Sequence, residues 1–324
     1  EVILPAYTCP AVAKVVLDLG LQPRLVDIAP ATLAYDLTQL NATVTEATLA
    51  VIQVHPFGLP LAVQPVLALA HPVGAVVIED AAQSLGAKLA GRPVGTVGDY
   101  GLFSLGPGKP LSTGGGGIVC AATVAAATRL TAGWPPLSPT SAPAAVAALV
   151  RLGILTLAFQ PTPWWLATRL GVQRVGDHEA SWGYRLRELT PTQAAVGLAQ
   201  LAHLDTYNQQ RRQKAHRLLA ALHEVTGVDL FARSHKETDE AIYLRFPLLV
   251  ADPVRRDRLF SQLWAAGIGV GRMYQRTLAD IFPQLNTGTY PGAQAIAQGL
   301  LTLPTHHFVT ERDINRIGEI FCTA

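Results

Sequence analysis

Three polar residues lie at the ends of predicted strands, and a lysine follows the last of them in a glycine-rich turn. Asp80, Ser104 and His55 each close a short β-branched run, and Lys109 lies five residues beyond Ser104 in a Gly-Pro-Gly turn. In a doubly wound sheet the carboxyl ends of the strands face one crevice, so these side chains should converge there. A partly desolvated lysine amine can act there as a nucleophile and then as a base.

Two nucleotide-binding interpretations of this region fail. A Walker-type loop needs glycine five residues before its Gly-Lys pair and Ser or Thr directly after the lysine, but those positions hold Phe103 and Pro110. The glycine run 114–117 precedes a predicted strand instead of opening a helix, so it lacks the dinucleotide-binding spacing. Neither nucleotide-binding motif therefore accounts for Lys109.

Composition excludes several classes of function. The chain has 324 residues, 49% of them hydrophobic and 15% charged, and its net charge is +2 without a long basic run, so no nucleic-acid partner is expected. Three scattered cysteines fit a reducing cytoplasm and are too few for a disulfide framework or a zinc site, so no metal is expected. The first residues do not resemble a signal peptide, and the start at Glu1 suggests a trimmed, processed or incomplete chain.

Strand-like and helical patterns alternate through residues 1–121, which predicts a doubly wound α/β sheet. We expect a large domain over residues 1–205 and a small α+β domain over 206–324. Residues 191–225 predict one long amphipathic helix between them, and residues 267–271 predict a strand. The strands expected in the first part are 1–4, 24–28, 49–55, 75–79, 101–105 and 117–121, with helices over 9–20 and 62–71.

Residues 123–181 form an apolar variable insert in this scheme. Residues 144–159 are almost wholly apolar apart from Arg151, and residues 163–170 contain Trp164 and Trp165. The run is shorter than the roughly 20 residues that span a bilayer. A buried helix is the simpler interpretation, and peripheral membrane contact through residues 144–170, with the tryptophans at headgroup level, is the alternative.

The segments 77–87 and 91–105, together with Lys109, resemble the core signature of the DegT/StrS-type sugar aminotransferases. Further matches follow in the same order at 2–8, 26–28, 54–58, 193–201, 290–293 and 303–306. The resemblance covers nearly the whole chain except 123–181. It implies an aspartate-aminotransferase-like (fold type I) large domain with a mostly parallel sheet, a small C-terminal α+β domain and pyridoxal phosphate as cofactor. It also implies a homodimer, and residues 144–170 could instead belong to the dimer interface.

The resemblance also implies roles for individual residues. Lys109 is the lysine that bonds covalently to the cofactor, and Asp80 lies opposite the pyridine nitrogen, which a carboxylate keeps protonated. Gln83 hydrogen-bonds the ring 3-oxygen, and Ser104 reaches the phosphate. A helix-surface amide and a strand-end hydroxyl are the structural alternatives for these last two residues.

Four further residues are candidates for substrate contact. Tyr7 and His55 lie at predicted strand ends, where they could equally satisfy backbone groups of loops. Arg272 and Tyr274 match a region that approaches the sugar nucleotide in the family, and an arginine fork suits a diphosphate. A surface position is the alternative for both of them.

Three departures from the family pattern leave two functions open. A Gly-Thr turn that holds the cofactor phosphate would lie before Glu1, Gly183 replaces an asparagine within residues 182–185, and Pro110 and Gly115 replace the family's usual asparagine and acidic residue. One function is transamination of a nucleotide-linked keto sugar, with glutamate or glutamine as donor, in polysaccharide or secondary-metabolite biosynthesis. The other is that of a non-catalytic relative that binds a sugar nucleotide or acts as a scaffold.

Overall fold

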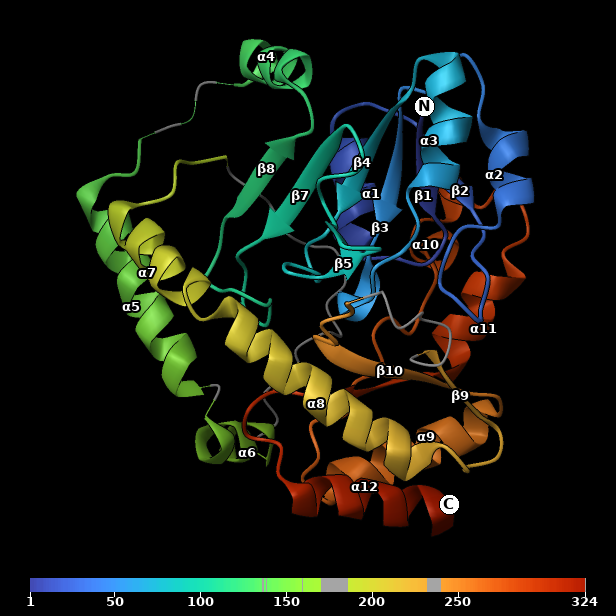
Figure 1. The fold of residues 1–324 in the computed structure, drawn as a ribbon, viewed down its shortest axis with the longest axis vertical. Coiled ribbons are helices and arrows are strands. Elements are labelled where there is room, and N and C mark those ends of the chain that lie inside the picture. The colour runs from blue at the N-terminus through green and yellow to red at the C-terminus, as the bar shows by residue number, and fades with distance from the viewer. Residues whose placement is uncertain (136, 138, 159, 170–185, 232–239, 324) are drawn as a thin grey trace.

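The structure is a computed structural model that describes residues 1–135, 137, 139–158, 160–169, 186–231 and 240–323. Its largest element is a six-stranded sheet with the order β2-β1-β3-β4-β7-β8 (Figure 1). The first five strands in this order run parallel, and β8 pairs antiparallel with β7 at one edge, so the expected mostly parallel sheet is confirmed. The strands are β1 (Val2–Pro5), β2 (Pro23–Val26), β3 (Ala50–Val54), β4 (Val76–Asp80), β7 (Tyr100–Ser104) and β8 (Gly117–Ala121).

Both faces of this sheet are buried, because side chains alternate between the faces along each strand. Ile3, Val51 and Val77 pack under α2 (Leu37–Thr43) and α3 (Gln64–Ala70). Their neighbours on the other face belong to a second core that includes α1 (Pro10–Asp18). The near-continuous apolar runs of the sequence are therefore the runs of a sheet covered by helices on both sides.

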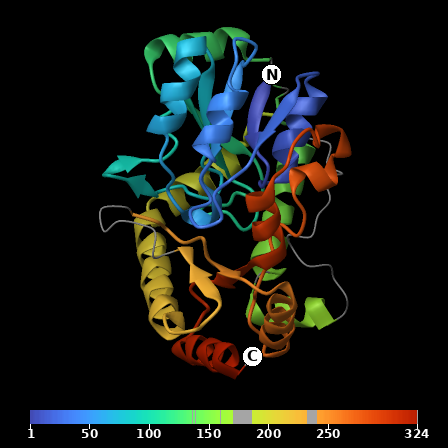
Figure 2. The ribbon, with the colours of Figure 1, turned by 90° about the vertical axis from the view of Figure 1, so that its right-hand side faces the viewer.

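A second, three-stranded antiparallel sheet has the order β11-β10-β9 and lies below the first in Figure 2. Its strands are β9 (Val228–Leu230), β10 (Arg245–Val250) and β11 (Leu300–Pro304), and its helices are α8 (Leu204–Leu222), α9 (Pro253–Ala265), α11 (Pro291–Gly299) and α12 (Glu311–Thr323). The sequence did not predict β11, although all five of its residues are buried. The expected domain boundary near residue 205 falls at the start of α8 and stays a prediction.

Two predicted elements are wrong. The expected helix over residues 191–225 is two helices, α7 (Pro191–Leu201) and α8, which meet at Ala202 and His203. No proline or glycine marks this break; instead α8 buries five residues, whereas α7 buries none, so tertiary packing sets the change. The expected strand 267–271 is an irregular segment in which only Gly271 forms a bridge, to Thr302.

Residues 142–158 and 161–169 of the apolar insert form helices, but the prediction of a buried helix over residues 144–159 is wrong. The helix α5 (Ala142–Ala158) has no buried residue and contacts α6 (Pro161–Arg169) and α7 at one edge of the molecule (Figure 1). Five of its large apolar side chains are 50–68% exposed: Val146, Leu149, Val150, Ile154 and Leu157. Among the described residues, no helix combines the length and apolar character needed to cross a bilayer.

Asp27, which follows β2, ties the second sheet region to the first. Its two carboxylate oxygens accept hydrogen bonds from the backbone N–H groups of Gly292 (2.8 Å) and Ala293 (2.7 Å) at the start of α11. A side chain at position 292 would place Cβ 1.9 Å from the carbonyl oxygen of Ile28, so only glycine allows this approach. The matching segments 26–28 and 290–293 are therefore two halves of one contact.

Glu79, in β4, is a fully buried carboxylate with four donors. Oε1 accepts from the N–H groups of Val97 and Gly98 (both 2.6 Å), and Oε2 accepts from Gly95 N–H (2.8 Å) and from His55 Nε2 (2.9 Å). Burial raises the pKa of Glu79, but the hydrogen bonds from His55 and from the backbone outweigh this and bring the pKa below its usual 4.5. Such a fully satisfied ion locks the surrounding turn to the sheet.

We expect Glu79→Gln to lower the free energy of unfolding at pH 7 by about 3 kcal/mol, because charge-assisted bonds are lost inside the protein. The folded pKa is lowered, so this stabilisation is complete above the unfolded value near 4.5 and disappears as the pH falls through the folded value. Denaturant unfolding of both proteins from pH 7 to 3 measures it. The exposed Glu46→Gln is the control, and curves for Glu79→Gln and wild type that stay parallel down to pH 3 would contradict the assignment.

Candidate active site

Asp80 is the last residue of β4 and lies beside the turn that carries Lys109. Asp80 pairs in register with Leu102 of β7, and Ser104 closes β7 two residues later. The charge of Lys109 is one of the influences that lower the pKa of Asp80, so the ammonium and the carboxylate lie within electrostatic reach. The structure thus brings together the carboxylate, the hydroxyl and the lysine that the sequence singled out.

The Asp80 carboxyl group is buried and only partly satisfied. It is 8% exposed, and Oδ1 accepts one hydrogen bond, from Ala82 N–H at 3.0 Å. Burial raises the pKa of Asp80, and the hydrogen bond from Ala82 and the charge of Lys109 only partly offset that rise. A carboxylate in this state gains from a cationic partner, and a protonated ring nitrogen is one.

Lys109 is half-buried and carries an uncommitted amine. In the part of the chain that the structure describes, its Nζ has neither a hydrogen bond nor an ion pair, while its backbone N–H donates to Gly106 O at 3.3 Å. Lys14 and Lys88, by contrast, form ion pairs with Asp18 and Glu240. An amine without a fixed partner is available for covalent chemistry.

Within the residues that the structure describes, Gln83 and Ser104 each keep one hydrogen-bonding group free. Gln83 Oε1 accepts from Phe57 N–H at 2.8 Å, which orients the side-chain amide and leaves its NH₂ group as a donor. Ser104 Oγ accepts from Gly106 N–H at 3.2 Å, which leaves its hydroxyl proton to donate. Both residues therefore present donors near Asp80, as an acceptor oxygen and a phosphate require.

His55 takes a structural position. Its side chain is fully buried; Nε2 lies 2.9 Å from Glu79, and Nδ1 accepts from Leu61 N–H at 3.0 Å. The second bond places the ring proton on Nε2, which then donates to the carboxylate. Both ring nitrogens are thus engaged inside the protein, so this arrangement does not support a hydrogen bond from His55 to substrate.

The glycine run after Lys109 is held by α7. Gln200 donates to Ser112 O (2.7 Å) and accepts from Ser112 N–H (3.0 Å), and Gln193 donates to Thr113 O (3.3 Å). Gly115 has φ 155°, a conformation that side-chain-bearing residues rarely adopt, so the absence of an acidic residue there matches the backbone. The sequence matched the segment 193–201 to the family but gave these glutamines no role.

Tyr7 and Tyr274 connect the two sheets beside Asp80. The Tyr7 hydroxyl donates to Met273 O and accepts from Tyr274 N–H, and the two rings meet edge to face at 5.9 Å. Burial raises the pKa of the Tyr274 phenol most, and Cys9, Tyr7 and Asp80 add to the rise, which places this phenol near Asp80. Tyr274 thus lies at the candidate site, with Tyr7 fixing its backbone.

Arg272 lies two residues before Tyr274 in the chain. Its Nη1 donates to Asp257 Oδ1 at 2.9 Å, and its guanidinium lies 4.1 Å from the centroid of the Phe260 ring. The residues 182–185, where Gly183 replaces an asparagine, lie outside the described residues.

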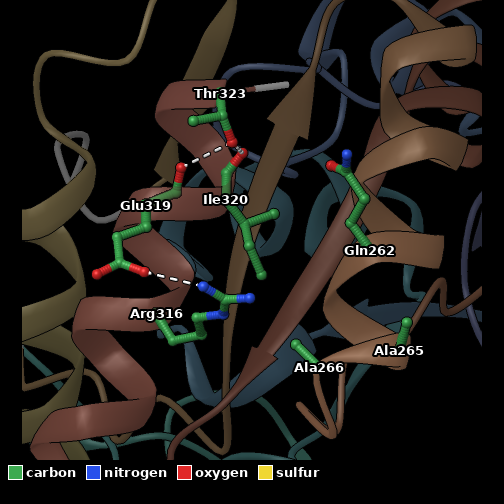
Figure 3. A pocket seen from close by; sticks show the side chains of 7 residues that line it. All are labelled: Gln262, Ala265, Ala266, Arg316, Glu319, Ile320 and Thr323. Carbon is green, nitrogen blue, oxygen red and sulfur yellow. Dashed lines mark hydrogen bonds and ion pairs between the residues drawn. The ribbon is translucent and has the colours of Figure 1, made fainter.

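A separate hollow of about 610 Å³ lies between α9 and α12, lined by Gln262, Arg316 and Ile320 among others (Figure 3). Its charged side chains, Arg316 and Glu319, pair with each other at 3.1 Å. None of the sequence-predicted site residues lines it, so it is not the candidate site. Among the described residues, no group of three or more His, Cys, Asp or Glu side chains could hold a metal ion.

Comparison with known proteins agrees with this geometry. The chain is 28% identical to UDP-N-acetyl-3-dehydro-alpha-D-glucosamine 3-aminotransferase of Acidithiobacillus ferrooxidans, over 99% of this chain and 76% of that protein. It is 28% identical to GDP-perosamine synthase of Caulobacter vibrioides, over 98% and 77%. The structure of DesV from S. venezuelae matches with a TM-score of 0.75 at 26% identity, covering 99% of this chain and 76% of that one.

A family model described as the DegT/DnrJ/EryC1/StrS aminotransferase family matches residues 1–321, which confirms the resemblance and the expected fold type. Pyridoxal phosphate is the cofactor of these enzymes. The chain belongs to the DegT/DnrJ/EryC1/StrS aminotransferase family.

Proposed function

We propose that this chain is an active, cytoplasmic aminotransferase that moves an amino group from an amino-acid donor to a keto sugar carried on a nucleotide. The observation that carries the proposal is the buried, partly satisfied Asp80 carboxylate within reach of the uncommitted Lys109 amine. The names of the relatives, one acting on a UDP-linked and one on a GDP-linked sugar, support the substrate class. Three cysteines without disulfides agree with a reducing compartment.

The residues present fit pyridoxal phosphate. Asp80 would hold a proton at the pyridine nitrogen, Gln83 would donate to the ring 3-oxygen, and Ser104 would donate to the phosphate. When bound, the cofactor supplies an electron sink for the negative charge that develops at the reacting carbon. The protein contributes the fixed carboxylate, and burial strengthens its interaction with a cation.

Lys109 would act as the general base and general acid of the reaction. Its amine can attach the cofactor covalently and, once released, take a proton from the amino-bearing carbon of the donor. The same amine can return a proton to the carbonyl-derived carbon of the sugar. Gln193 and Gln200 hold the run that follows Lys109, and so limit where the amine can reach.

We expect Asp80→Asn to reduce transamination about 100-fold or more, because a preorganised charge is removed from the site. The folded pKa of Asp80 is raised, so its ionised form costs stability as the pH rises through that value. The variant should therefore unfold at the same or a higher temperature than wild type at pH 7.5, with the difference shrinking towards pH 4. Steady-state rates and thermal unfolding at both pH values measure this. A variant that loses stability and keeps its activity contradicts the assignment.

We expect Lys109→Ala to abolish covalent cofactor attachment. Borohydride reduction of protein incubated with pyridoxal phosphate, followed by peptide mass spectrometry, should find the adduct at Lys109 in wild type and none in the variant. Lys14→Ala, which removes a surface amine paired with Asp18, is the matched control and should behave like wild type. An adduct elsewhere overturns the role of Lys109. Binding of a UDP-sugar without any adduct or turnover would instead identify a non-catalytic relative.

The exposed apolar face of α5 needs a partner, because contiguous patches of this kind mark contact surfaces. A second copy of the chain is the partner we propose, since the family resemblance implies dimers. Ile154→Asp should then shift the protein from dimer to monomer in analytical ultracentrifugation. A monomeric wild type that floats with anionic liposomes would indicate the peripheral membrane contact instead, and one that does neither would refute both.

A further inference from the structure

Arg256 in α9 is a buried arginine whose donors are largely unused. The residue is 7% exposed, and its Nε–H and Nη1 groups have no hydrogen-bond partner. Nε lies 2.8 Å from Asp257 Oδ1, but this ion pair lacks the direction of a hydrogen bond. Arg272 Nε is also buried without a partner. Among the described residues, these three nitrogens are the only such side-chain atoms.

Arg245 shows how the same region normally buries a guanidinium. Its Nε donates to Thr302 Oγ1 (2.7 Å), and its Nη2 donates to Gly269 O (2.6 Å) and Thr302 O (3.0 Å). Unpaired donors in a protein interior are costly, and natural structures rarely keep them without a reason. The unpaired N–H donors of Arg256 and Arg272 therefore indicate a site for a hydrogen-bond acceptor of a ligand.

The local charge is also incomplete. Arg256 and Arg272 share one carboxylate, that of Asp257, at 2.8 and 2.9 Å. Two guanidinium groups and one carboxylate leave a net charge of +1. A single negative charge would neutralise the cluster, and a carboxylate carries one, whereas a diphosphate carries at least two.

The position of Arg256 relates it to the candidate site. Its charge acts on the Tyr7 phenol, whose hydroxyl holds the peptide between Met273 and Tyr274. The charge of Asp80 is one of the influences that raise the pKa of the Tyr274 phenol. Arg272, which shares Asp257 with Arg256, directly precedes Met273 and Tyr274, so a ligand group bound by both arginines would lie close to the peptide that the Tyr7 hydroxyl holds.

We propose that Arg256, with Arg272, binds a carboxylate of the amino-acid donor. The planar fork of an arginine matches a carboxylate in two parallel hydrogen bonds, and the stacking of Arg272 on Phe260 fixes the second guanidinium. This inference rests on the proposed transamination, since it concerns the donor of that reaction. It also replaces the diphosphate contact expected of Arg272 with a contact to a smaller, singly charged group.

Binding of two probes to the full-length chain loaded with pyridoxal phosphate tests the proposal. Glutarate has the carboxylates of a donor but no amino group, and UDP has the diphosphate of a sugar nucleotide. Calorimetric titration should show glutarate binding about tenfold weaker or more in Arg256→Gln, with UDP binding unchanged. Arg258→Gln, an exposed arginine on the same helix, should match wild type for both probes.

Arg256→Lys keeps the charge without the fork and should weaken glutarate binding less than Arg256→Gln. Because Nε and Nη1 make no hydrogen bond in the protein, Arg256→Gln should unfold near the wild-type temperature; if it does not fold, the lysine variant decides. Equal glutarate affinity in wild type and the Arg256 variants overturns the proposal. So does weaker UDP binding with unchanged glutarate binding, which would place a phosphate there. Repeating the titration in Lys109→Ala, which cannot transaminate, separates failure of this site from failure of the proposed function.

Discussion

The candidate site depends on how the protein accommodates two adjacent carboxylates at the end of β4. Side chains alternate along a strand, so Glu79 and Asp80 point to opposite faces. Glu79 enters the interior, where four donors hold it ionised; Asp80 faces the turn of Lys109, where one backbone N–H meets it. Their pKa values move in opposite directions, down for Glu79 and up for Asp80. The Glu79 charge is compensated by hydrogen bonds within the protein, whereas the Asp80 charge remains available to a ligand.

The hydrogen bonds of Glu79 fix the position of Asp80, the next residue along β4. Glu79 joins β4 to His55 after β3 and to the turn 95–98, and that turn lies against Gly101 of β7, where a Cβ would fall 1.9 Å from the carbonyl oxygen of Gly95. The carboxyl ends of β3 and β4 are thus fixed to each other and to the start of β7. Preorganised electrostatic groups act best when the surrounding structure prevents them from moving. The rigidity around Glu79 is what allows Asp80 to stay poorly solvated.

The sequence predicts the parts of this arrangement that have a local pattern. Alternating β-branched runs predict the parallel sheet, and the ordered motifs point to Lys109 and Asp80. Glu79 carries no such signal, because its role is set by donors 16 to 24 residues away. The break between α7 and α8 and the exposure of α5 were missed for the same reason: both depend on what each helix packs against, not on its own residues. For His55 the strand-end position leaves a ligand contact and a structural role equally open, because position alone cannot show that both ring nitrogens are used.

Arg256 is the counterpart of Asp80 on the other side of the tyrosine pair. Each is a buried charge that the protein leaves incompletely compensated, and such groups lower stability unless a ligand completes them. A fold optimised only for stability would pair Arg256 as it pairs Arg245. A bound cation would complete the compensation of Asp80 and a bound anion that of Arg256; the charge of Asp80 acts on the Tyr274 phenol, and that of Arg256 acts on the Tyr7 phenol. The ring nitrogen of the cofactor would compensate Asp80, and the carboxylate of an amino-acid donor would compensate Arg256. Two incompletely compensated charges of opposite sign therefore favour a cationic cofactor ring at Asp80 and an anionic amino-acid donor at Arg256.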